Sequence, residues 1–444
     1  MMAARRSLSQ AAFNTKIDAL TKAAITGGAS SFSVLLNTLP SVYPTELLAS
    51  LDRLAASGAI STLVAAAVRR DAATKKSAVA EGQSLLPLPH PLDFEWRFTP
   101  DAARAMLNRA ADMTPAGGEL LLFGTPGLAV EALTLPIARR LAFLAENNCV
   151  TDRIVALNRA TGSPLAIAFC SCGLPRESAD AVLLDPPWYL DFVRPMLAAA
   201  AHACRPGGVV LISLPPDGTR PNSEADRYSA IAFGRRLGLD LIDHCAHSIG
   251  YETPFFERNS LAACGIYPPP HWRRGDLLVL RKGRESTQAP LSSSAHRREW
   301  TEVCIGRMRL SIRKPRKTAS GEARLASLIE GDVLPTVSRR DPRRRLAQVW
   351  TSGNRIFHTG DPQLLHDAAI SCAGEAKKAG VQSRLWSTMK EREALEQIAD
   401  DLRALAALEV QEEQGMTTES PERSVTWRSS STKYWNRSTA TVSG

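Results

Sequence analysis

The sequence predicts an α/β protein with a doubly wound, mostly parallel, seven-stranded sheet, flanked by a helical N-terminal domain and a basic C-terminal region. Between residues 92 and 284, short apolar runs alternate with helical patterns, which is typical of a parallel sheet covered by helices on both faces. Residues 1–86 carry Ala and Leu at helical spacing. The residues after 284 are rich in Lys and Arg.

The predicted sheet is assembled from seven apolar runs. They follow a short extended piece at 94–98 and a helix from Pro100 to about Met113, and they lie at 119–123, 153–157, 165–169, 181–184, 209–212, 239–242 and 276–280. Strands buried on both faces are apolar along their whole length, whereas half-exposed strands alternate. The runs therefore place one sheet domain at 92–284.

The remaining chain divides into further units, because 444 residues exceed what one hydrophobic core usually organises. Residues 1–86 form the helical domain, in which 45–61 fits either a winged-helix module or a plain helical extension. Pro87, Pro89 and Pro91 mark a linker at 87–91. A basic region at 285–375 precedes a helix at 376–415. Residues 416–444 are polar without periodic apolar positions, so we expect a disordered tail.

Charge and cysteine usage limit the classes of partner and compartment. The net charge is +9, and residues 271–350 hold 19 Lys and Arg against 8 Asp and Glu, which favours a polyanionic partner such as DNA or RNA. Eight cysteines without paired spacing are typical of reduced thiols in the cytoplasm. No apolar leader segment and no window of ~18 apolar residues is present, so neither secretion nor membrane insertion is expected.

The segment Asp185-Pro186-Pro187-Trp188 directly follows the run at 181–184 and precedes a predicted helix at 190–203. It should therefore lie at the carboxyl end of a central strand, where open α/β sheets bind ligands. A turn with no further role is the alternative, since Asp and Pro both favour turns. The apolar strand before the segment, the helix after it and the aromatic residue within it favour a reaction centre.

These residue types suit the methylation of an exocyclic amine. Its lone pair is delocalised into a ring, so a catalyst should accept hydrogen bonds from the amino group and favour the positively charged nitrogen of the transition state. Asp185 would supply a carboxylate and Pro186 a carbonyl oxygen. Pro187 would make the corner rigid. Trp188 would offer a flat surface to a base extruded from its stack.

This arrangement resembles the class I S-adenosylmethionine-dependent amino-methyltransferases that carry a (D/N)PP(W/Y/F) signature and modify adenine N6 or cytosine N4. The resemblance covers residues 119–283 and implies a Rossmann-like methyltransferase domain with S-adenosyl-L-methionine as cofactor. In that family a small-residue turn after the first strand surrounds the methionine part of the cofactor. Here the corresponding turn is Phe123-Gly124-Thr125-Pro126-Gly127.

The family's second strand commonly ends in an acid that contacts the ribose hydroxyls. With the second strand predicted at 153–157, the corresponding residue is Asn158, a neutral and therefore weaker hydrogen-bonding partner. Together with the irregular glycine turn, this departure keeps open a protein that retains the fold without the activity.

The densest basic cluster is predicted to contact nucleic acid. It contains Arg339, Arg340, Arg343, Arg344 and Arg345, whose binding to phosphates would be strongly salt-dependent. A solvated basic loop is the alternative.

Two further sets of residues have both a structural and a functional interpretation. The aromatic stretch from Tyr251 to Glu257 is predicted to pack in the core and alternatively to form one wall of an acceptor pocket. His244, Cys245, His247, Cys264 and His271 match no standard zinc spacing, so no metal site is expected.

The sequence therefore predicts an enzyme that transfers a methyl group from S-adenosylmethionine to an exocyclic amine of a nucleic-acid base, with adenine N6 ahead of cytosine N4 and DNA methylation as one expected role. The alternatives are methylation of a protein side-chain amine, and a non-catalytic nucleic-acid-binding or scaffold protein on a degenerate methyltransferase fold.

Overall fold

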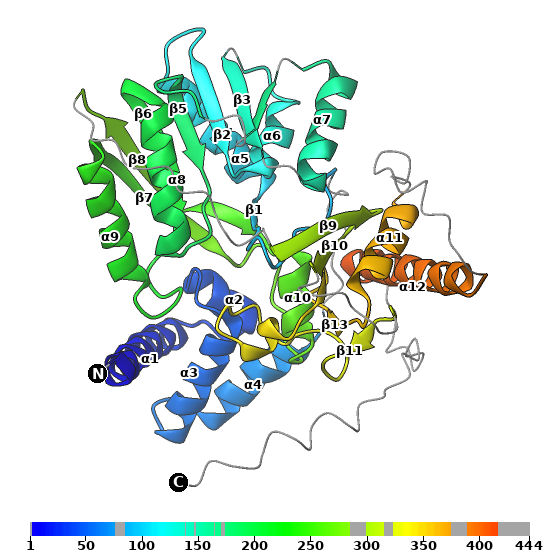
Figure 1. The fold of residues 1–444 in the computed structure, drawn as a ribbon. Helices are drawn as coiled ribbons and strands as arrows, with labels where there is room; N and C mark the ends of the chain where they lie inside the picture. Colours follow the sequence, from blue (N-terminus) through cyan, green and yellow to red (C-terminus); the bar gives the residue numbers. More distant parts are fainter. Residues whose placement is uncertain are drawn as a thin grey trace.

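The computed structural model describes residues 2–75, 85–137, 139–145, 148–163, 165–169, 174–284, 299–314, 323–373 and 389–415. A helical N-terminal unit, a central α/β sheet and a C-terminal unit built on a small antiparallel sheet pack against one another (Figure 1). The predicted tail at 416–444 lies outside the described residues.

The N-terminal unit consists of four helices, which are α1 (Met2–Thr26), α2 (Phe32–Thr38), α3 (Pro44–Ala56) and α4 (Thr62–Ala73). Ser31 and Ser61 cap α2 and α4 through their side-chain oxygens. Leu35, Leu47 and Val68 bury the apolar helix faces in a common core, which Trp272 of the central domain completes. Residues 2–75 contain helices alone, so they lack the strand pair that a winged-helix module would require.

The central sheet has eight strands in the order β1-β7-β8-β6-β5-β2-β3-β4. Their bounds are β1 (Arg97–Phe98), β2 (Glu119–Phe123), β3 (Arg140–Ala145), β4 (Ala166–Phe169), β5 (Ala179–Leu184), β6 (Cys204–Leu214), β7 (Leu239–Glu252) and β8 (Arg274–Lys282). Neighbouring strands from β4 to β6 pair in parallel, while β8 is antiparallel to both β6 and β7. The predicted doubly wound, mostly parallel sheet is confirmed, but it has eight strands instead of the seven expected, because β1 pairs with β7 at its edge.

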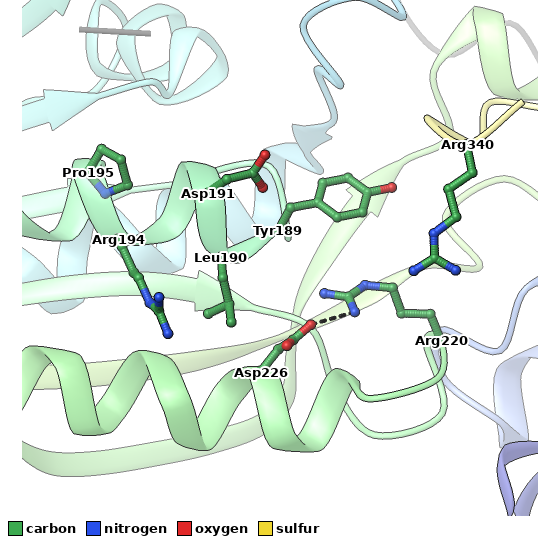
Figure 2. Close-up of a pocket in the computed structure, with 8 residues that line it drawn as sticks. All are labelled: Tyr189, Leu190, Asp191, Arg194, Pro195, Arg220, Asp226 and Arg340. Carbon is green, nitrogen blue, oxygen red and sulfur yellow. Dashed lines mark ion pairs between the residues drawn. The ribbon is translucent and has the colours of Figure 1, made fainter. Parts of the chain in front are cut away.

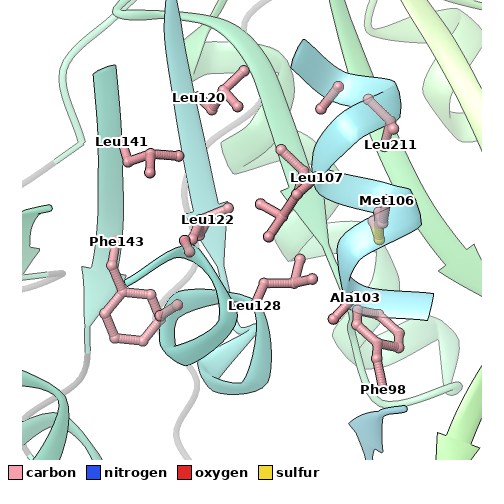
Figure 3. Packing of buried hydrophobic residues seen from close by; sticks show 14 of the residues in the cluster. Phe98, Ala103, Met106, Leu107, Leu120, Leu122, Leu128, Leu141, Phe143 and Leu211 are labelled. Atoms are coloured by element: carbon pink, nitrogen blue, oxygen red, sulfur yellow. The ribbon is translucent and has the colours of Figure 1, made fainter. Parts of the chain in front are cut away.

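Helices cover both faces of this sheet. They are α5 (Pro100–Asp112), α6 (Pro126–Ala132), α7 (Cys149–Thr161), α8 (Leu190–Ala203) and α9 (Ser223–Arg236), whereas α10 (Phe255–Ala262) lies beside the N-terminal unit and contributes Leu261 to its core (Figure 1). Met106 and Leu107 of α5 pack against Leu120 and Leu122 on one face (Figure 3). Alternate strand residues such as Leu121 pack against α8 and α9 on the other face. This burial on both sides explains why the strands are continuously apolar.

One predicted strand is wrong. Residues 153–157 lie within helix α7, which the Asn148 side chain caps by accepting a hydrogen bond from the Thr151 amide and which ends at the left-handed Gly162. The second strand of the sheet is instead β3, a run that the sequence reading missed. Both segments are short and apolar, so composition did not separate them, whereas the helix caps do.

The C-terminal unit is a five-stranded antiparallel sheet in the order β11-β13-β12-β10-β9. Its elements are β9 (Trp300–Ile305), β10 (Met308–Arg313), β11 (Ala326–Ser327), a 3-10 turn (Pro342–Arg345), β12 (Val349–Thr351), β13 (Ile356–His358), α11 (Pro362–Cys372) and α12 (Met389–Glu413). Leu402 and Leu405 of α12 pack into the core of this unit. The predicted basic region therefore has an apolar core of its own.

The proline segment at 87–91 is not a free linker. All five of its residues are buried, the Leu88 amide donates to the Arg307 carbonyl at 2.8 Å, and the His90 ring lies 3.1 Å from the Trp350 carbonyl oxygen. Prolines without free N–H groups can cross an interface without leaving unsatisfied donors. The segment thus joins the central sheet to the C-terminal unit.

The expectation of reduced cysteines is wrong for one pair. Cys149 at the start of α7 and Cys304 of β9 form a disulfide, with Cα atoms 6.2 Å apart and a separation of 155 positions in sequence. So long a separation is not visible as a spacing motif, because the fold alone brings the two segments together. Cys170 and Cys172 lie outside the described residues. None of the described helices is both long and apolar enough to cross a bilayer.

Candidate functional site

The expected cofactor turn and the Asp-Pro-Pro-Trp segment lie side by side at the carboxyl ends of β2 and β5. These strands are parallel neighbours with Phe123 in register with Leu184, so Gly124 and Asp185 both follow directly after paired residues. From β2 the chain proceeds outward through β3 to β4, and from β5 outward to β6, which makes this pair the topological switch point of the sheet. Open α/β sheets bind their ligands at such a point.

The turn after β2 is tight and leads directly into α6. Gly124 has φ +66°, and a Cβ atom there would lie 2.8 Å from Met196 Cε and 3.9 Å from the Asp185 carbonyl oxygen. The left-handed backbone therefore favours glycine, whereas the spatial conflict is with the end of the flexible Met196 side chain. Pro126 starts the helix. The Oγ1 atom of Thr125 is buried without a hydrogen-bond partner among the described residues, and such an orphaned group suits a turn that closes around a polar ligand.

Asp185 is held by a chain of hydroxyl groups. The Tyr251 hydroxyl donates to Asp185 Oδ1 at 2.6 Å, and Ser213 Oγ lies 2.6 Å from the same hydroxyl. Oδ2 has no hydrogen-bond partner among the described residues, so one carboxylate oxygen can accept a hydrogen bond from the amine of a substrate. Burial raises the pKa of Asp185 to about 8, against the hydrogen bond from Tyr251 and the charge of Arg273, which both lower it.

The carbonyl oxygens of the two prolines differ in their hydrogen bonding. The Pro187 carbonyl accepts a hydrogen bond from the Tyr189 amide at 2.6 Å, whereas the Pro186 carbonyl has no such donor among the described residues. Arg220 holds the end of the segment by donating to the Trp188 carbonyl at 2.6 Å. Asp185 Oδ2 and the Pro186 carbonyl oxygen thus both lack a hydrogen-bond donor among the described residues, and their role as a pair of acceptors stays a prediction.

Trp188 does not present the open aromatic face that we expected. Its side chain is 8% exposed and belongs to the core of the sheet domain, with its ring packed edge-on against Tyr251 at 5.5 Å between centroids. The Arg273 guanidinium lies over the indole at 4.3 Å from the centroid. The indole is apolar and large, so packing it under the corner stabilises the segment instead of leaving a free stacking surface.

Asn158 is not at the sheet edge where the cofactor was expected. It lies in α7, and its side-chain amide donates to the Leu165 carbonyl at 2.8 Å, which links the end of the helix to the start of β4. The error follows from the misplaced second strand. In sequence, the residue directly after β3 is Glu146, an acid at the position that the resembled family uses for the ribose; it lies outside the described residues.

The predicted nucleic-acid-binding cluster is mostly engaged within the protein. Arg339 forms an ion pair with Asp191 at 2.7 Å, Arg343 pairs with Asp341 at 2.7 Å, and Arg344 stacks on Trp350 at 4.4 Å from the ring centroid. Burial lowers the pKa of Arg344 to about 10. The side chains of Arg340 and Arg345 are exposed. Within the cluster, these two arginines remain open to an external phosphate.

Arg339 also connects the C-terminal unit to the central site. Its guanidinium lies 4.7 Å from the centroid of the Tyr189 ring, and Arg220 lies 5.3 Å from the same centroid. The residue next to Trp188 is therefore held between two arginines from different parts of the chain. Arg339 belongs to the cluster that the sequence predicts to bind a polyanion. In the structure it contacts the loop after the diproline corner and helps to fix the position of that loop.

An open groove lies beside this loop. Its volume is about 590 Å³, and Figure 2 shows the side chains around it, which come from the start of α8, from α9 and its preceding loop, and from the C-terminal unit: Tyr189, Leu190, Asp191, Arg194, Pro195, Arg220, Asp226 and Arg340. Arg220 and Asp226 pair at 2.6 Å within it. Arg340 adds an exposed positive charge at its rim.

Sequence reasoning missed two residues of this site and placed a third only as an alternative. Tyr251 is buried in the core, as predicted, and its hydroxyl also contacts Asp185, while a role of the 251–257 stretch as a wall of an acceptor pocket stays a prediction. Arg273 and Arg220 were not singled out, because single arginines in loops carry no local pattern. Among the described residues no group of three or more His, Cys, Asp or Glu side chains is arranged to hold a metal ion.

No protein-family model and no curated protein matches the sequence. Among solved structures, the chain is similar to a mutein of the branched-chain polyamine synthase from Thermus thermophilus in complex with N4-aminopropylspermidine and 5'-methylthioadenosine, with 15% identity, 63% of this chain and 90% of that chain covered and a TM-score of 0.46. It is also similar to a methyltransferase from Pyrococcus furiosus (17% identity, 42% and 83% covered, TM-score 0.29) and to TrmN from Thermus thermophilus (18% identity, 43% and 51% covered, TM-score 0.30).

Proposed function

We propose that the protein is an S-adenosylmethionine-dependent methyltransferase that acts on an exocyclic amine of a nucleic-acid base, with adenine N6 as the first candidate. The observation that carries this proposal is the junction of the Gly124 turn with the Asp185 corner at the switch point of the sheet. A cofactor turn and a pair of amine-binding oxygens must be adjacent for a methyl group to pass directly between their ligands.

The residues present suit the cofactor. Gly124 allows a close backbone approach, and the unpartnered Thr125 hydroxyl offers a hydrogen bond. When bound, S-adenosylmethionine supplies an electrophilic methyl group on a sulfonium. We place its methionine part at residues 123–127, and Glu146 replaces Asn158 as the candidate for its ribose hydroxyls.

Asp185 and Pro186 orient the acceptor. The free Oδ2 atom and the Pro186 carbonyl oxygen each accept one N–H of the amino group, which directs the nitrogen lone pair away from the ring plane. The positive charge that develops on the nitrogen is stabilised by the carboxylate in a partly dry site. Trp188, buried beneath, keeps the corner in place.

The direct test is transfer of labelled methyl from S-adenosylmethionine to DNA and to RNA, combined with calorimetry of cofactor binding. We expect binding and incorporation into one of the two polymers. Label that survives nuclease but not protease would assign the activity to a protein side-chain amine instead. A folded protein that binds no cofactor at millimolar concentration would contradict the proposal and favour a non-catalytic binding protein.

The activity should rise with pH, because only the ionised Asp185 carries the negative charge that stabilises the positive nitrogen of the acceptor amine and leaves both carboxylate oxygens able to accept hydrogen bonds. Its pKa is about 8, so the carboxyl is largely protonated at pH 6 and largely ionised at pH 9. Replacing Tyr251 with Phe removes a hydrogen bond that favours the ionised form, so the pKa rises further and the pH profile moves to higher pH. We expect roughly a tenfold lower kcat/KM at pH 7 for Tyr251→Phe.

The measurement is kcat/KM between pH 6 and 10 for the wild type and Tyr251→Phe, with Tyr228→Phe as the matched control, because Tyr228 is exposed on α9. Coincident profiles of wild type and Tyr251→Phe would contradict the role given to the hydroxyl chain.

A further inference from the structure

We propose that Arg273 binds a phosphate group of the acceptor nucleotide, so that the site recognises a nucleotide by its phosphate as well as by its amine. This inference rests on the proposed function and names a binding residue that neither the motif nor the basic cluster contains. It is carried by the placement of the Arg273 side chain between two indole rings.

The Arg273 guanidinium is held on both faces. It lies 4.1 Å from the ring centroid of Trp96 and 4.3 Å from that of Trp188. Both indoles are in turn packed edge-on against the Tyr251 ring, at 6.2 Å and 5.5 Å between centroids. Stacking on two sides removes the rotational freedom of the planar group, so its N–H donors keep a fixed direction.

These donors are not used inside the protein. The Arg273 side chain is half-buried, and it makes no hydrogen bond or ion pair with any of the described residues. By contrast, Arg97, Arg227, Arg309 and Arg355, which are more deeply buried, each pair with a carboxylate. A guanidinium that is fixed in place and left without an anion is a preformed site for one.

Two acids lie within electrostatic range of this charge. Asp185 and Glu257 are the carboxyl groups that interact electrostatically with Arg273, but neither forms an ion pair with it. Glu257 is buried, and burial raises its pKa to about 7, against the charge of Arg273 and a hydrogen bond from Tyr43, which both lower it. Tyr43, Tyr189 and Tyr251 also lie within electrostatic range of the guanidinium, and burial raises the pKa of Tyr43 and of Tyr251.

The position of Arg273 favours the acceptor over the cofactor. It directly precedes β8, which lies beyond β6 from β5, whereas the cofactor turn follows β2 on the opposite side of β5. A nucleotide whose amine meets Asp185 therefore has room for its phosphate on the Trp188 side, away from the methionine part of the cofactor. A planar guanidinium can donate two parallel, charge-assisted hydrogen bonds to two oxygens of one phosphate group.

The test compares two single-stranded five-nucleotide oligomers with a central adenosine, one with natural phosphodiesters and one with neutral methylphosphonates on both sides of that adenosine. DNA and RNA versions are titrated in calorimetry without cofactor. We expect the wild type to bind the natural form of one polymer at least about tenfold more tightly than its neutral form. Arg273→Met should remove this preference, and Arg273→Lys should keep part of it because the charge remains without the planar fork.

Arg140→Met is the matched control, since its side chain is 70% exposed and lies at the start of β3, at the end of the sheet opposite the site; it should keep the full preference. Thermal unfolding of each variant checks its fold, and Arg273→Lys serves if Arg273→Met is unstable. Equal binding of both oligomers by the wild type, no binding of either, or a preference that survives in Arg273→Met would overturn the assignment. Phosphate-dependent binding without any methyl transfer would instead contradict the proposed function and leave Arg273 as a phosphate site.

Discussion

Replacing Asp185 with Asn is expected to lower kcat for methyl transfer at least about 100-fold while cofactor binding is retained. The substitution keeps the size of the side chain but removes the negative charge that stabilises the developing cation on the acceptor nitrogen. In one orientation of the introduced amide, its NH2 group would face the N–H of the substrate amine, and two donors cannot form a hydrogen bond with each other. The cofactor turn is a separate element, so the dissociation constant for S-adenosylmethionine should change less than about threefold.

The measurement is single-turnover methyl transfer together with calorimetry of cofactor binding, at a pH above the pKa of Asp185. Asp112→Asn is the control, because Asp112 is an exposed acid at the end of α5 and outside the site. Rates of Asp185→Asn within threefold of the wild type would remove Asp185 from the mechanism. Loss of cofactor binding in the same variant would show that the corner acts on the cofactor and not on the acceptor.

Replacing Arg309 with Met is expected to destabilise the folded chain by about 3–5 kcal/mol. Arg309 is 1% exposed and pairs with Asp93, with Glu95 at 2.7 Å and with Glu302 at 2.5 Å. Burial by itself would lower its pKa, but these three carboxylates raise it. Without the guanidinium they face one another in a site with little water, where their mutual repulsion is weakly screened.

The effect should depend on pH in a defined direction. Because the destabilisation comes from repulsion between carboxylates that have lost Arg309, it should be largest near neutral pH and shrink as the carboxyl groups are protonated in acid. Thermal unfolding followed by calorimetry at pH 7 and at pH 4 measures this. Arg345→Met, with its exposed side chain, should stay within about 0.5 kcal/mol of the wild type. A difference between the two variants below 1 kcal/mol at pH 7 would show that the network contributes little.

Local patterns predicted the elements that frame the site. The run at 119–123 and the helix at 190–203 are β2 and α8 with the predicted bounds, and the motif at 185–188 follows β5 as expected. Strands buried on both faces leave a continuous apolar signal, and a diproline ends it sharply. The assignment of roles to these residues stays a proposal.

One error arose where two segments had the same composition, and the intramolecular partners of the charged residues could not be seen in the sequence. The run at 153–157 is as apolar as β3, and only the Asn148 and Gly162 caps distinguish the helix. Arg339, Arg343 and Arg344 form a basic cluster in sequence, but in the structure they meet Asp191, Asp341 and Trp350. A sequence shows the charge of a residue and does not show which distant group satisfies it.

By itself, the sequence determined the class of fold and the position of the diproline corner, because hydrophobic periodicity and proline restrict the backbone through neighbours a few residues away. The tertiary structure alone decided what surrounds that corner. The Tyr251 hydroxyl contacts Asp185, although the two residues are 66 positions apart in sequence. Arg273, Trp96 and Trp188 come from three separate segments, and the guanidinium lies against both indole rings. Such contacts depend on strand order and on the packing of side chains, and neither leaves a trace in the local pattern from which a sequence is read.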